Sequence, residues 1–328
     1  MTDPAVTFAD IEAAAERLRP YINRTPLLRS MVLDMRAAGT VFLKAECVQR
    51  TGSFKIRGAL NRILQLTEGQ RGAGVVAYSS GNHAQGVALA AKLAGVSATI
   101  VMPEDAPEVK RDRTRRLGAE IVTYERLSES REDIAAGIAE ERGAVLVPPF
   151  EDRHIIAGQG TVGLEILEEL SRQGRTIDQV LACCSGGGLS AGIGIAMAEK
   201  SPHTKLITVE PNGFDDVKRS LNAGTRVTNA PGNESICDAL LLPTPGALTF
   251  SILKGLGARG VSVSDREVMG AIRFAAEELR VVVEPGGAVA LAALLYGHVE
   301  SRDVSTAAIL SGGNIDMPVF DRALRYAA

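Results

Sequence analysis

The stretch QVLACCSGGGLSAG, residues 179–192, joins an apolar run to three consecutive glycines and then to a helix-like segment. Continuous apolar runs of this length are typical of strands buried on both faces of a parallel sheet. A glycine-rich turn that opens a helix lets backbone N–H groups point at an anion such as a phosphate. The stretch therefore predicts an α/β protein with an anion site where this strand leads into its helix.

Short apolar runs alternate with helical patterns of roughly 10–16 residues in both directions from this stretch. This rhythm predicts two open, mainly parallel sheets flanked by helices. The predicted strands are VFLKA (41–45), VVAY (75–78), ATIVM (98–102), EIVTY (120–124), AVLV (144–147), QVLACC (179–184), KLITVE (205–210), GVSVS (260–264) and TAAILS (306–311).

Two breaks in the chain suggest where domains meet. The pair Pro148–Pro149 follows one predicted strand, and the segment EGQRGAG lies at 68–74. They predict a large domain of residues 1–75 and 151–328, and a small inserted domain of residues 76–150.

Composition excludes several classes of function. The chain of 328 residues has a net charge of −3 and no basic block, so nucleic acid is not an expected partner. No apolar run is long enough to span a membrane, and the N-terminus lacks the residue order of a signal peptide. Four cysteines, two of them adjacent, form no disulfide framework, and the four histidines are scattered. We therefore expect a cytoplasmic protein without a transition-metal site.

Two more loops of unusual composition follow predicted strands. SSGNHAQG (79–86) offers hydroxyls, a carboxamide and the N–H groups of a helix start, which suit a carboxylate. SGGN (311–314) places a serine hydroxyl at the end of a buried strand. Each loop alone also fits an ordinary turn stabilised by small polar residues.

SFKIRG, residues 53–58, places Lys55 in the first turn of an expected helix. The partial positive charge of a helix N-terminus destabilises an ammonium group, which predicts a lowered pKa for Lys55. A neutral amine, a carboxylate cradle, a phosphate cradle and a lone hydroxyl together match the needs of pyridoxal phosphate.

A serine hydrolase is the alternative of another class. GLSAG, residues 188–192, matches the GxSxG pattern with Ser190 as nucleophile, in the required context of strand, turn and helix. Such an enzyme needs a histidine downstream, and only His203 and His298 follow Ser190.

Five motifs occur in the order found in fold type II pyridoxal-phosphate enzymes: LKAECVQRTGSFKIRGA, SSGNHAQG, IAGQGT, CSGGGLSAG and SGGN. From about residue 5 to 320 the chain resembles the serine/threonine dehydratase and serine racemase family, which includes the 3-hydroxyaspartate ammonia-lyases. The resemblance implies a tryptophan-synthase-β-like fold, pyridoxal 5'-phosphate as cofactor and a homodimer. It also implies that the small domain carries the loop for the substrate carboxylate.

The resemblance also implies roles for particular residues. Lys55 would form the Schiff base, with Phe54 against the pyridine ring. Asn82 would bond the ring hydroxyl and Ser311 would face the ring nitrogen. The phosphate would be surrounded by Ser185, Gly186, Gly187, Gly188 and Leu189. The substrate carboxylate would rest on Ser79, Ser80, Asn82 and His83.

ITVEPNGFDD, residues 207–216, resembles the cation site of the family. The implied ligands are Glu210, the carbonyl of Phe214 and Asp216. Oxygen ligands favour Mg²⁺ or Ca²⁺. The alternative is an acidic surface loop.

The expected reaction is dehydration and deamination of a β-hydroxy amino acid to a 2-oxo acid and ammonia. A hydroxyl beside the ring nitrogen leaves that nitrogen largely unprotonated, which favours loss of a β-substituent over transamination. The freed amine of Lys55 would remove the Cα proton. In a racemase, a residue at the position of Ser80 supplies a second acid or base, so serine racemase is an alternative.

Two features of the sequence point to different substrates. Arg131 in SESRED (128–133) resembles an arginine that reaches the substrate in racemases and 3-hydroxyaspartate ammonia-lyases, where it would bind a second carboxylate. Its alternative is a solvated arginine on a helix. VPPFED (147–152) resembles threonine dehydratases, and serine or threonine is the favoured substrate. The chain ends 14 residues after SGGN, so we expect no isoleucine-binding regulatory domain.

Overall fold

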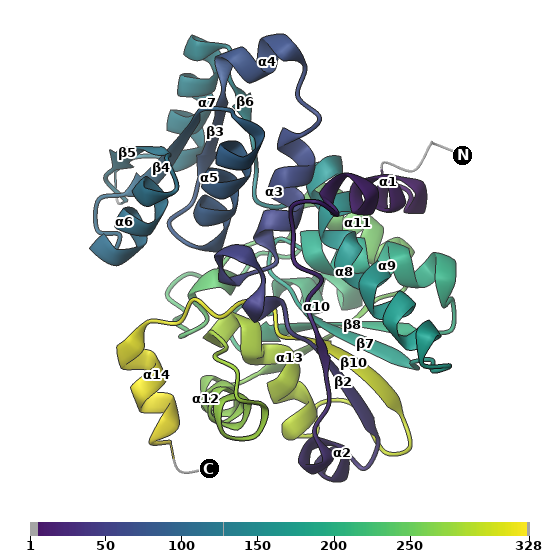
Figure 1. The fold of residues 1–328 in the computed structure, drawn as a ribbon. Coiled ribbons are helices and arrows are strands. Elements are labelled where there is room, and N and C mark those ends of the chain that lie inside the picture. Colours follow the sequence, from purple (N-terminus) through teal and green to yellow (C-terminus); the bar gives the residue numbers. More distant parts are fainter. Residues whose placement is uncertain (1–5, 127, 327–328) are drawn as a thin grey trace.

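Six strands form the larger of two sheets in the computed structural model, which describes residues 6–126 and 128–326 (Figure 1). All neighbouring strands are parallel except the first pair, which is antiparallel. Their order is β1 (Leu27–Leu28), β2 (Thr40–Lys44), β10 (Ser305–Ile309), β7 (Gln179–Cys183), β8 (Lys205–Pro211) and β9 (Arg259–Val263). Every residue of β7 is buried, as the apolar run from Val180 onward predicts, and the polar Gln179 at its start is buried as well.

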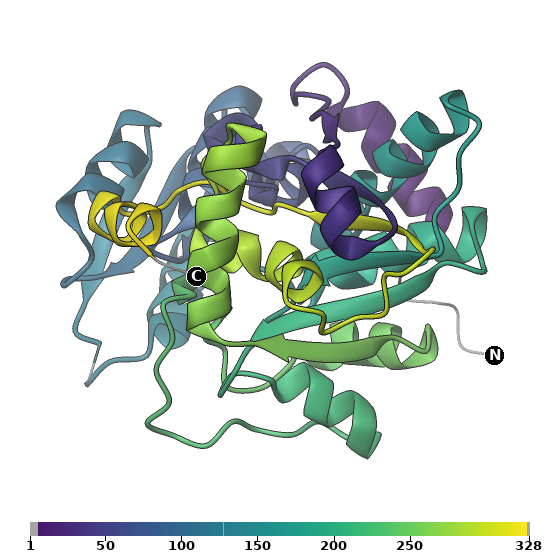
Figure 2. The same cartoon turned by 90° about the horizontal axis from the view of Figure 1, so that it is seen from below.

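Helices cover both faces of this sheet (Figures 1 and 2). One face carries α8 (Arg153–Arg172) and α9 (Gly188–Lys200), with α1 (Phe8–Leu18) packed on both helices. The other carries α2 (Met31–Ala37), α12 (Asp265–Phe274) and α13 (Pro285–Leu295), whose residues are buried from Pro285 to Leu294. The remaining helices of this part are α10 (Asp216–Ala223), α11 (Ala247–Gly255) and α14 (Met317–Leu324).

Four parallel strands form the second sheet, which lies at the upper left in Figure 1. Their order is β5 (Glu120–Tyr124), β4 (Ala98–Pro103), β3 (Val75–Tyr78) and β6 (Val145–Leu146). Successive side chains of a strand point to opposite faces. Val75 and Ala77 therefore pack in the cluster that includes helix α5, whereas Val76 packs in the cluster that includes α7. The helices of this part are α4 (Glu68–Ala73), α5 (Asn82–Ala94), α6 (Glu108–Arg116) and α7 (Arg131–Arg142).

Helix α3 (Lys55–Ile63) lies between α5 and α8. Its apolar residues Ile56, Leu60 and Ile63 are fully buried in the same cluster as Val75 of the second sheet. A helix that precedes the predicted insertion thus helps to build the core around the smaller sheet. The predicted domain boundaries therefore remain a prediction. Residues 1–5 of the predicted large domain lie outside the described residues.

The predicted fold class is confirmed, with two open and mainly parallel sheets flanked by helices. All nine predicted strands occur; two match at both ends, and the other seven differ by one or two residues at one or both ends. Strand β1 was not predicted because two residues carry no readable periodicity. In the part of the chain that the structure describes, no helix combines the length and apolarity needed to cross a membrane.

Candidate active site

The predicted site residues lie where strands of the two sheets end. Ser185 follows β7 and Ser311 follows β10, which are neighbours in the larger sheet. Ser79 follows β3 of the smaller sheet. The backbone N–H of Phe54 donates to the carbonyl of Ser311 over 3.1 Å, and a bridge joins Ser53 to Gly312. The segment with the lysine is therefore bound directly to the SGGN loop.

Lys55 is the first residue of α3, and no side chain caps this helix. Lys55 as a residue is half-buried, and its Nζ donates to the carbonyl oxygen of Pro149 over 3.1 Å and lies 5.2 Å from the centre of the Phe54 ring. Desolvation lowers the pKa of Lys55 to about 8, although the neighbouring Cys183 and Glu284 act in the opposite direction. The direction agrees with the sequence-based expectation, but its main cause is burial rather than the helix end.

The glycine loop after β7 is shaped by close contacts. A Cβ atom at Gly186 would overlap the ring of Phe150, and one at Gly188 would lie 3.1 Å from the Phe150 Cβ. Gly187 has φ +88°, a value that side chains disfavour. Helix α9 begins at Gly188 without a capping side chain, so its first N–H groups stay available to an anion. This cradle fits a phosphate group.

Ser311 lies beside Cys183 at the carboxyl end of the larger sheet. The two side chains are 3% and 6% exposed, and the thiol Sγ donates to Ser311 Oγ over 3.2 Å. Burial raises the pKa of the Cys183 thiol to about 11, against the effects of Ser311 and Lys55. The thiol is therefore protonated at neutral pH and acts as a donor.

The loop after β3 leads into α5, whose N-cap Gly81 supplies no side chain. The first N–H groups of this helix can therefore bind a carboxylate. Ser79 Oγ accepts from the N–H of Gly81 over 3.2 Å. His83 does not offer its ring to a ligand, because Nε2 contacts the carbonyl of Val147 over 2.8 Å and the ring is 3% exposed. Desolvation lowers the pKa of His83 to about 3, so the ring is neutral.

Asn82 is held by two partners at the start of α5. Its Oδ1 accepts from Asn314 Nδ2 over 2.7 Å, and its Nδ2 donates to the carboxylate of Glu284. Asn314 also donates to the carbonyl of Thr51 over 2.7 Å, which links the amide to the segment before Lys55. The orientation of the Asn82 amide is thereby fixed.

Glu284 is a site residue that the sequence reasoning missed. It is the N-cap of α13 and only 4% exposed. Burial raises its pKa to about 7, with a further raising effect of Asp238, while Asn82 and Lys110 lower it. The available signal was an acidic residue between the apolar run VVV and Pro-Gly-Gly in residues 281–287. A buried acid in such a run is costly unless it is paired or functional.

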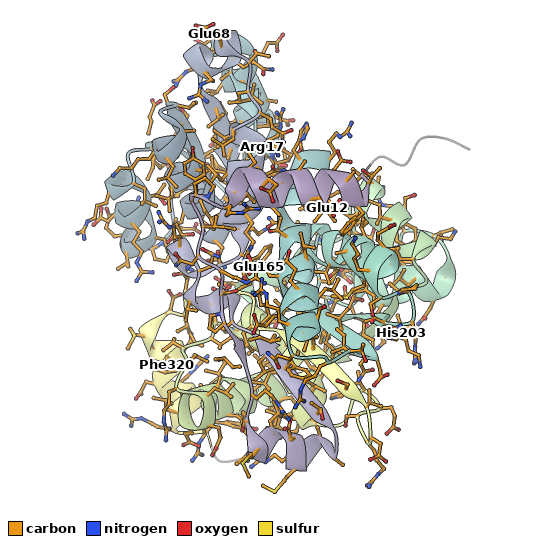
Figure 3. The ribbon with its side chains drawn as sticks, turned by 45° about the vertical axis from the view of Figure 1, so that its right-hand side comes forward. Glu12, Arg17, Glu68, Glu165, His203 and Phe320 are labelled. Carbon is orange, nitrogen blue, oxygen red and sulfur yellow. The ribbon has the colours of Figure 1, made fainter. Side chains whose placement is uncertain are left out.

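A buried ionic network lies behind Lys55 and was also missed. Arg57, which is fully buried, binds Glu46 over 2.8 Å and Glu165 over 2.7 Å. Lys44 of β2 also pairs with Glu165, which lies on α8 toward the middle of the fold in Figure 3. These ion pairs link the first turn of α3 to β2 and α8. The partners in this network are up to 121 residues apart, so spacing along the sequence could not identify them.

Arg131 is the first residue of α7, and its partners are not among the residues that surround Lys55. Its Cζ is 5.6 Å from the centre of the Tyr78 ring, and its Nε pairs with Glu132 over 2.8 Å. Tyr78 ends β3, so Arg131 lies near the strand that leads into the Ser79 loop.

Glu210, near the end of β8, and Asp216, the first residue of α10, are neighbours. Both carboxylate oxygens of Glu210 accept N–H groups, from Val217 over 2.9 Å and Lys218 over 2.8 Å. Asp216 Oδ1 accepts from Asn229, whereas its buried Oδ2 has no partner among the described residues. Burial raises the pKa of both carboxyl groups, that of Asp216 to about 6. The described residues contain no group of three or more His, Cys, Asp or Glu side chains arranged for a metal ion.

Ser190 does not have the surroundings of a catalytic nucleophile. It is fully buried in α9, and its Oγ donates to the carbonyl of Cys183 over 3.0 Å. His203 contacts Ser201, and His298 contacts Glu267. The hydrolase alternative therefore lacks both the exposure and the histidine partner that it requires.

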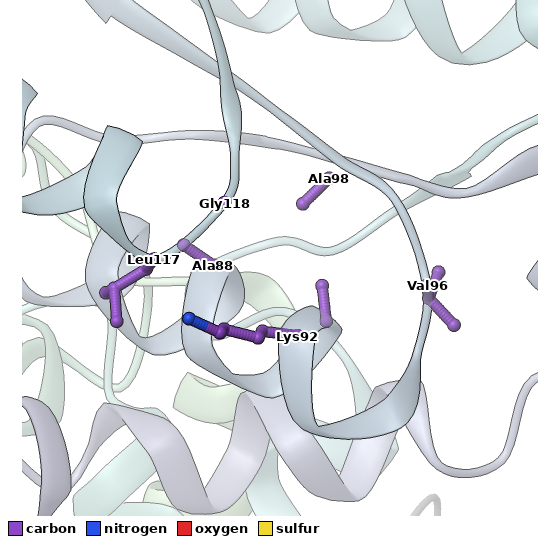
Figure 4. A pocket seen from close by; sticks show the side chains of 7 residues that line it. Ala88, Lys92, Val96, Ala98, Leu117 and Gly118 are labelled. Carbon is purple, nitrogen blue, oxygen red and sulfur yellow. The ribbon is translucent and has the colours of Figure 1, made fainter.

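A small surface pocket lies between α5 and β4, away from these groups (Figure 4). It is lined by residues that include Ala88, Lys92, Val96 and Leu117. None of the predicted site residues lines it, so we do not assign the chemistry to this pocket.

Together, an amine of lowered pKa, an uncapped glycine turn and a buried hydroxyl are groups that an enzyme dependent on pyridoxal phosphate requires. Residues 18–312 match the family described as pyridoxal-phosphate dependent enzyme, and the chain belongs to this family.

Relatives of the chain match nearly its whole length. An L-threonine ammonia-lyase of Thermotoga maritima is 41% identical over 97% of this chain and 78% of the relative. An L-threo-3-hydroxyaspartate ammonia-lyase of Saccharomyces cerevisiae is 40% identical over 95% of this chain and 94% of the relative. The structure of maize serine racemase has a TM-score of 0.91 and 37% identity, covering 98% of this chain and 97% of that one.

Proposed function

We propose that this chain dehydrates and deaminates a β-hydroxy amino acid, with pyridoxal 5'-phosphate as cofactor, and releases a 2-oxo acid and ammonia. The observation that supports the proposal is the pKa of the Lys55 amine, which is lowered to about 8. Hydrogen bonds link the segment around Lys55 to Ser311 and, through Asn314, to Asn82. An amine of this pKa is partly neutral at physiological pH, as a nucleophile and a base must be.

The proposed cofactor seat uses loops at strand ends of the larger sheet, together with Phe54 before α3 and Asn82 at the start of α5. The N–H groups from Ser185 to Leu189 bind the phosphate, and the Ser311 hydroxyl faces the ring nitrogen. Phe54 packs against the ring, and the Asn82 side chain forms a hydrogen bond with the ring hydroxyl. The bound cofactor supplies an aldehyde that bonds to an amine and a ring that withdraws electrons from the substrate Cα.

The proposed substrate seat uses the loop after β3. Ser79, Ser80, Asn82 and the N–H of His83 hold the substrate carboxylate. Once the substrate amine has displaced Lys55, the free amine of Lys55 would take the proton from Cα. The β-hydroxyl would leave as water with a proton that the cofactor phosphate supplies, and hydrolysis of the released enamine would give the 2-oxo acid and ammonia. Because Ser311 brings a hydroxyl and not a carboxylate to the ring nitrogen, that nitrogen stays neutral, which favours β-elimination over transamination. Ser80 also suits proton transfer from the opposite side, so serine racemisation is a second activity to test.

Threonine or serine is the proposed substrate, with 3-hydroxyaspartate as the alternative. Relatives of about 40% identity carry names for each of the two ammonia-lyase reactions. Arg131 would favour 3-hydroxyaspartate if its guanidinium left Glu132 to bind the second carboxylate. Comparison of threonine with 3-hydroxyaspartate in wild type and Arg131→Ala tests this: a selective loss on 3-hydroxyaspartate supports the role of Arg131, and equal rates in both proteins contradict it.

A divalent cation, Mg²⁺ or Ca²⁺, is proposed at Glu210, the carbonyl of Phe214 and Asp216. The buried and unpartnered Asp216 Oδ2 supports it, because two neighbouring acids of raised pKa are stabilised by a cation. We further propose a cytoplasmic homodimer, in which residues 76–150 form the domain with the substrate loop.

The test of the proposed function uses purified protein loaded with pyridoxal phosphate. We expect borohydride to attach the cofactor irreversibly at Lys55, as a mass spectrum of the digested protein will show. Lys55→Ala should reduce ammonia release from the best hydroxy amino acid about a thousandfold. Lys92→Ala, which changes a lysine of the surface pocket, is the matched control. Full activity of Lys55→Ala would overturn the proposal.

A further inference from the structure

Cys183 has no part in the reaction as described, yet its thiol contacts a residue that faces the cofactor. The side chain ends β7, while Ser311 follows β10, the neighbouring strand. The Sγ–Oγ distance is 3.2 Å, and both side chains are more than nine-tenths buried. Water is therefore excluded as a competing partner of the Ser311 hydroxyl.

The direction of this hydrogen bond follows from the chemistry of the two groups. A serine hydroxyl has one proton to donate and two lone pairs to accept, whereas sulfur is a weak acceptor. Because the thiol stays protonated, its S–H group donates to Ser311 Oγ. The single hydroxyl proton of Ser311 is then free for a better acceptor than sulfur.

We propose that Cys183 is a positioning residue that turns the Ser311 hydroxyl proton toward the pyridine nitrogen and so keeps this nitrogen unprotonated. The inference rests on the proposed function, because it needs pyridoxal phosphate in the seat described above. A ring nitrogen that accepts from Ser311 cannot also carry its own proton on that lone pair. Cys183 thereby weakens the ring as an electron sink and favours loss of the β-hydroxyl over transamination.

The pair Cys183 and Cys184 offers a matched control. Cys184 is equally buried, at 2% exposure, but its surroundings include Ser190 and Glu210 instead of Ser311. Cys183→Ala and Cys183→Val both remove the donor, and valine retains most of the volume. Cys183→Ser keeps a donor at the same place. Cys184→Ala should leave Ser311 undisturbed.

The direct readout is the protonation of the ring nitrogen, and it does not depend on turnover. Each variant is loaded with pyridoxal phosphate that is isotopically labelled at this nitrogen and is examined by nitrogen NMR across neutral pH. We expect the resonance of Cys183→Ala and Cys183→Val to move toward that of a protonated pyridine. The resonances of Cys183→Ser and Cys184→Ala should match the wild type.

A second readout is the partition between two reactions. The rate at which alanine converts the bound cofactor to its amine form, divided by the elimination rate, should rise about fivefold without the thiol donor. Unchanged resonance and partition in both Cys183→Ala and Cys183→Val would overturn the role of Cys183. A wild-type protein that binds no cofactor would instead overturn the proposed function, so the two failures are distinguishable.

Discussion

The Nζ atom of Lys55 lies 3.1 Å from the carbonyl oxygen of Pro149, although 94 residues separate them along the chain. Pro149 belongs to the segment that returns from the smaller sheet, and Lys55 opens the helix that packs between the two groups of helices. The amine is thus held where both parts of the fold meet, in surroundings dry enough to lower its pKa.

The pKa of Lys55, about 8 instead of 10.5, predicts how fast the protein takes up its cofactor. Only the neutral amine attacks an aldehyde, and its fraction grows as the pH rises through 8. We therefore expect the rate of reconstitution of cofactor-free protein to rise between about pH 7 and pH 9 and then to level off. Stopped-flow absorbance measures the rate, and a profile that still rises steeply near pH 10 would show an unshifted lysine.

Glu284 predicts a pH dependence of stability. Its pKa is 4.5 in the unfolded chain and about 7 in the fold, so the folded protein binds an extra proton between these values. Stability contributed by the protonated form is complete below pH 4.5 and is lost as the pH rises toward 7. Glu284→Gln removes this dependence. The free energies of unfolding of the two proteins should diverge by at most about 3 kcal/mol over this range.

Urea titrations of wild type and Glu284→Gln at about pH 4.5 and about pH 7.5 measure this divergence. Parallel stability profiles of the two proteins would show that Glu284 titrates in the fold as it does in water. Glu277→Gln is the control, since Glu277 is exposed on the surface and pairs with Arg273.

The Arg57 network predicts a large loss of stability from a single change. Arg57→Leu leaves Glu46 buried without its partner, which should reduce the free energy of unfolding by about 3–5 kcal/mol. Glu46→Gln added to Arg57→Leu removes the unpaired charge and should restore part of the loss. Urea denaturation measures both effects. Equal stabilities of the single and double variants would contradict the coupling of these residues.

Gly186 predicts a loss of cofactor affinity by steric overlap. The methyl group of Gly186→Ala would meet the Phe150 ring and push the loop out of place, which should weaken pyridoxal phosphate binding at least about tenfold. Gly69→Ala is the control, because nothing lies within 4 Å of a Cβ at this position. Addition of Phe150→Ala to Gly186→Ala should recover affinity if overlap is the cause. Titration of the protein with cofactor, followed by absorbance, measures the affinity of the wild type and of the three variants.

Patterns that repeat along the chain were predictable from sequence. The apolar runs of β7 and β4 are continuous because helices cover both faces of their sheets, and the glycine loop follows β7 because a backbone must turn sharply there. The loop positions of Ser79, Ser185 and Ser311 follow from the rule that ligands bind at the carboxyl ends of strands. Lys55 was predicted instead from its place in the first turn of a helix.

Contacts between distant segments were not predictable. The partners of Arg57 and Asn82 come from other helices and loops, and no spacing within a motif encodes them. The burial that governs the pKa of Lys55 and Glu284 is likewise a property of the packed fold. His83 shows the same limit: its loop was predictable, but the turn of its ring toward Val147 was not.

The two sheets divide the work of the proposed site. The glycine loop and Ser311 lie at strand ends of the larger sheet, whereas the Ser79 loop and Arg131 belong to strands and helices of the smaller one. In the proposed site, mutations in the Ser79 loop or at Arg131 would accordingly act on the bound amino acid, whereas Asn82 is the one residue proposed to contact vitamin B6 that belongs to the smaller-sheet side. Such a division lets a lineage acquire new substrates by gradual change, without a period in which the protein loses its coenzyme.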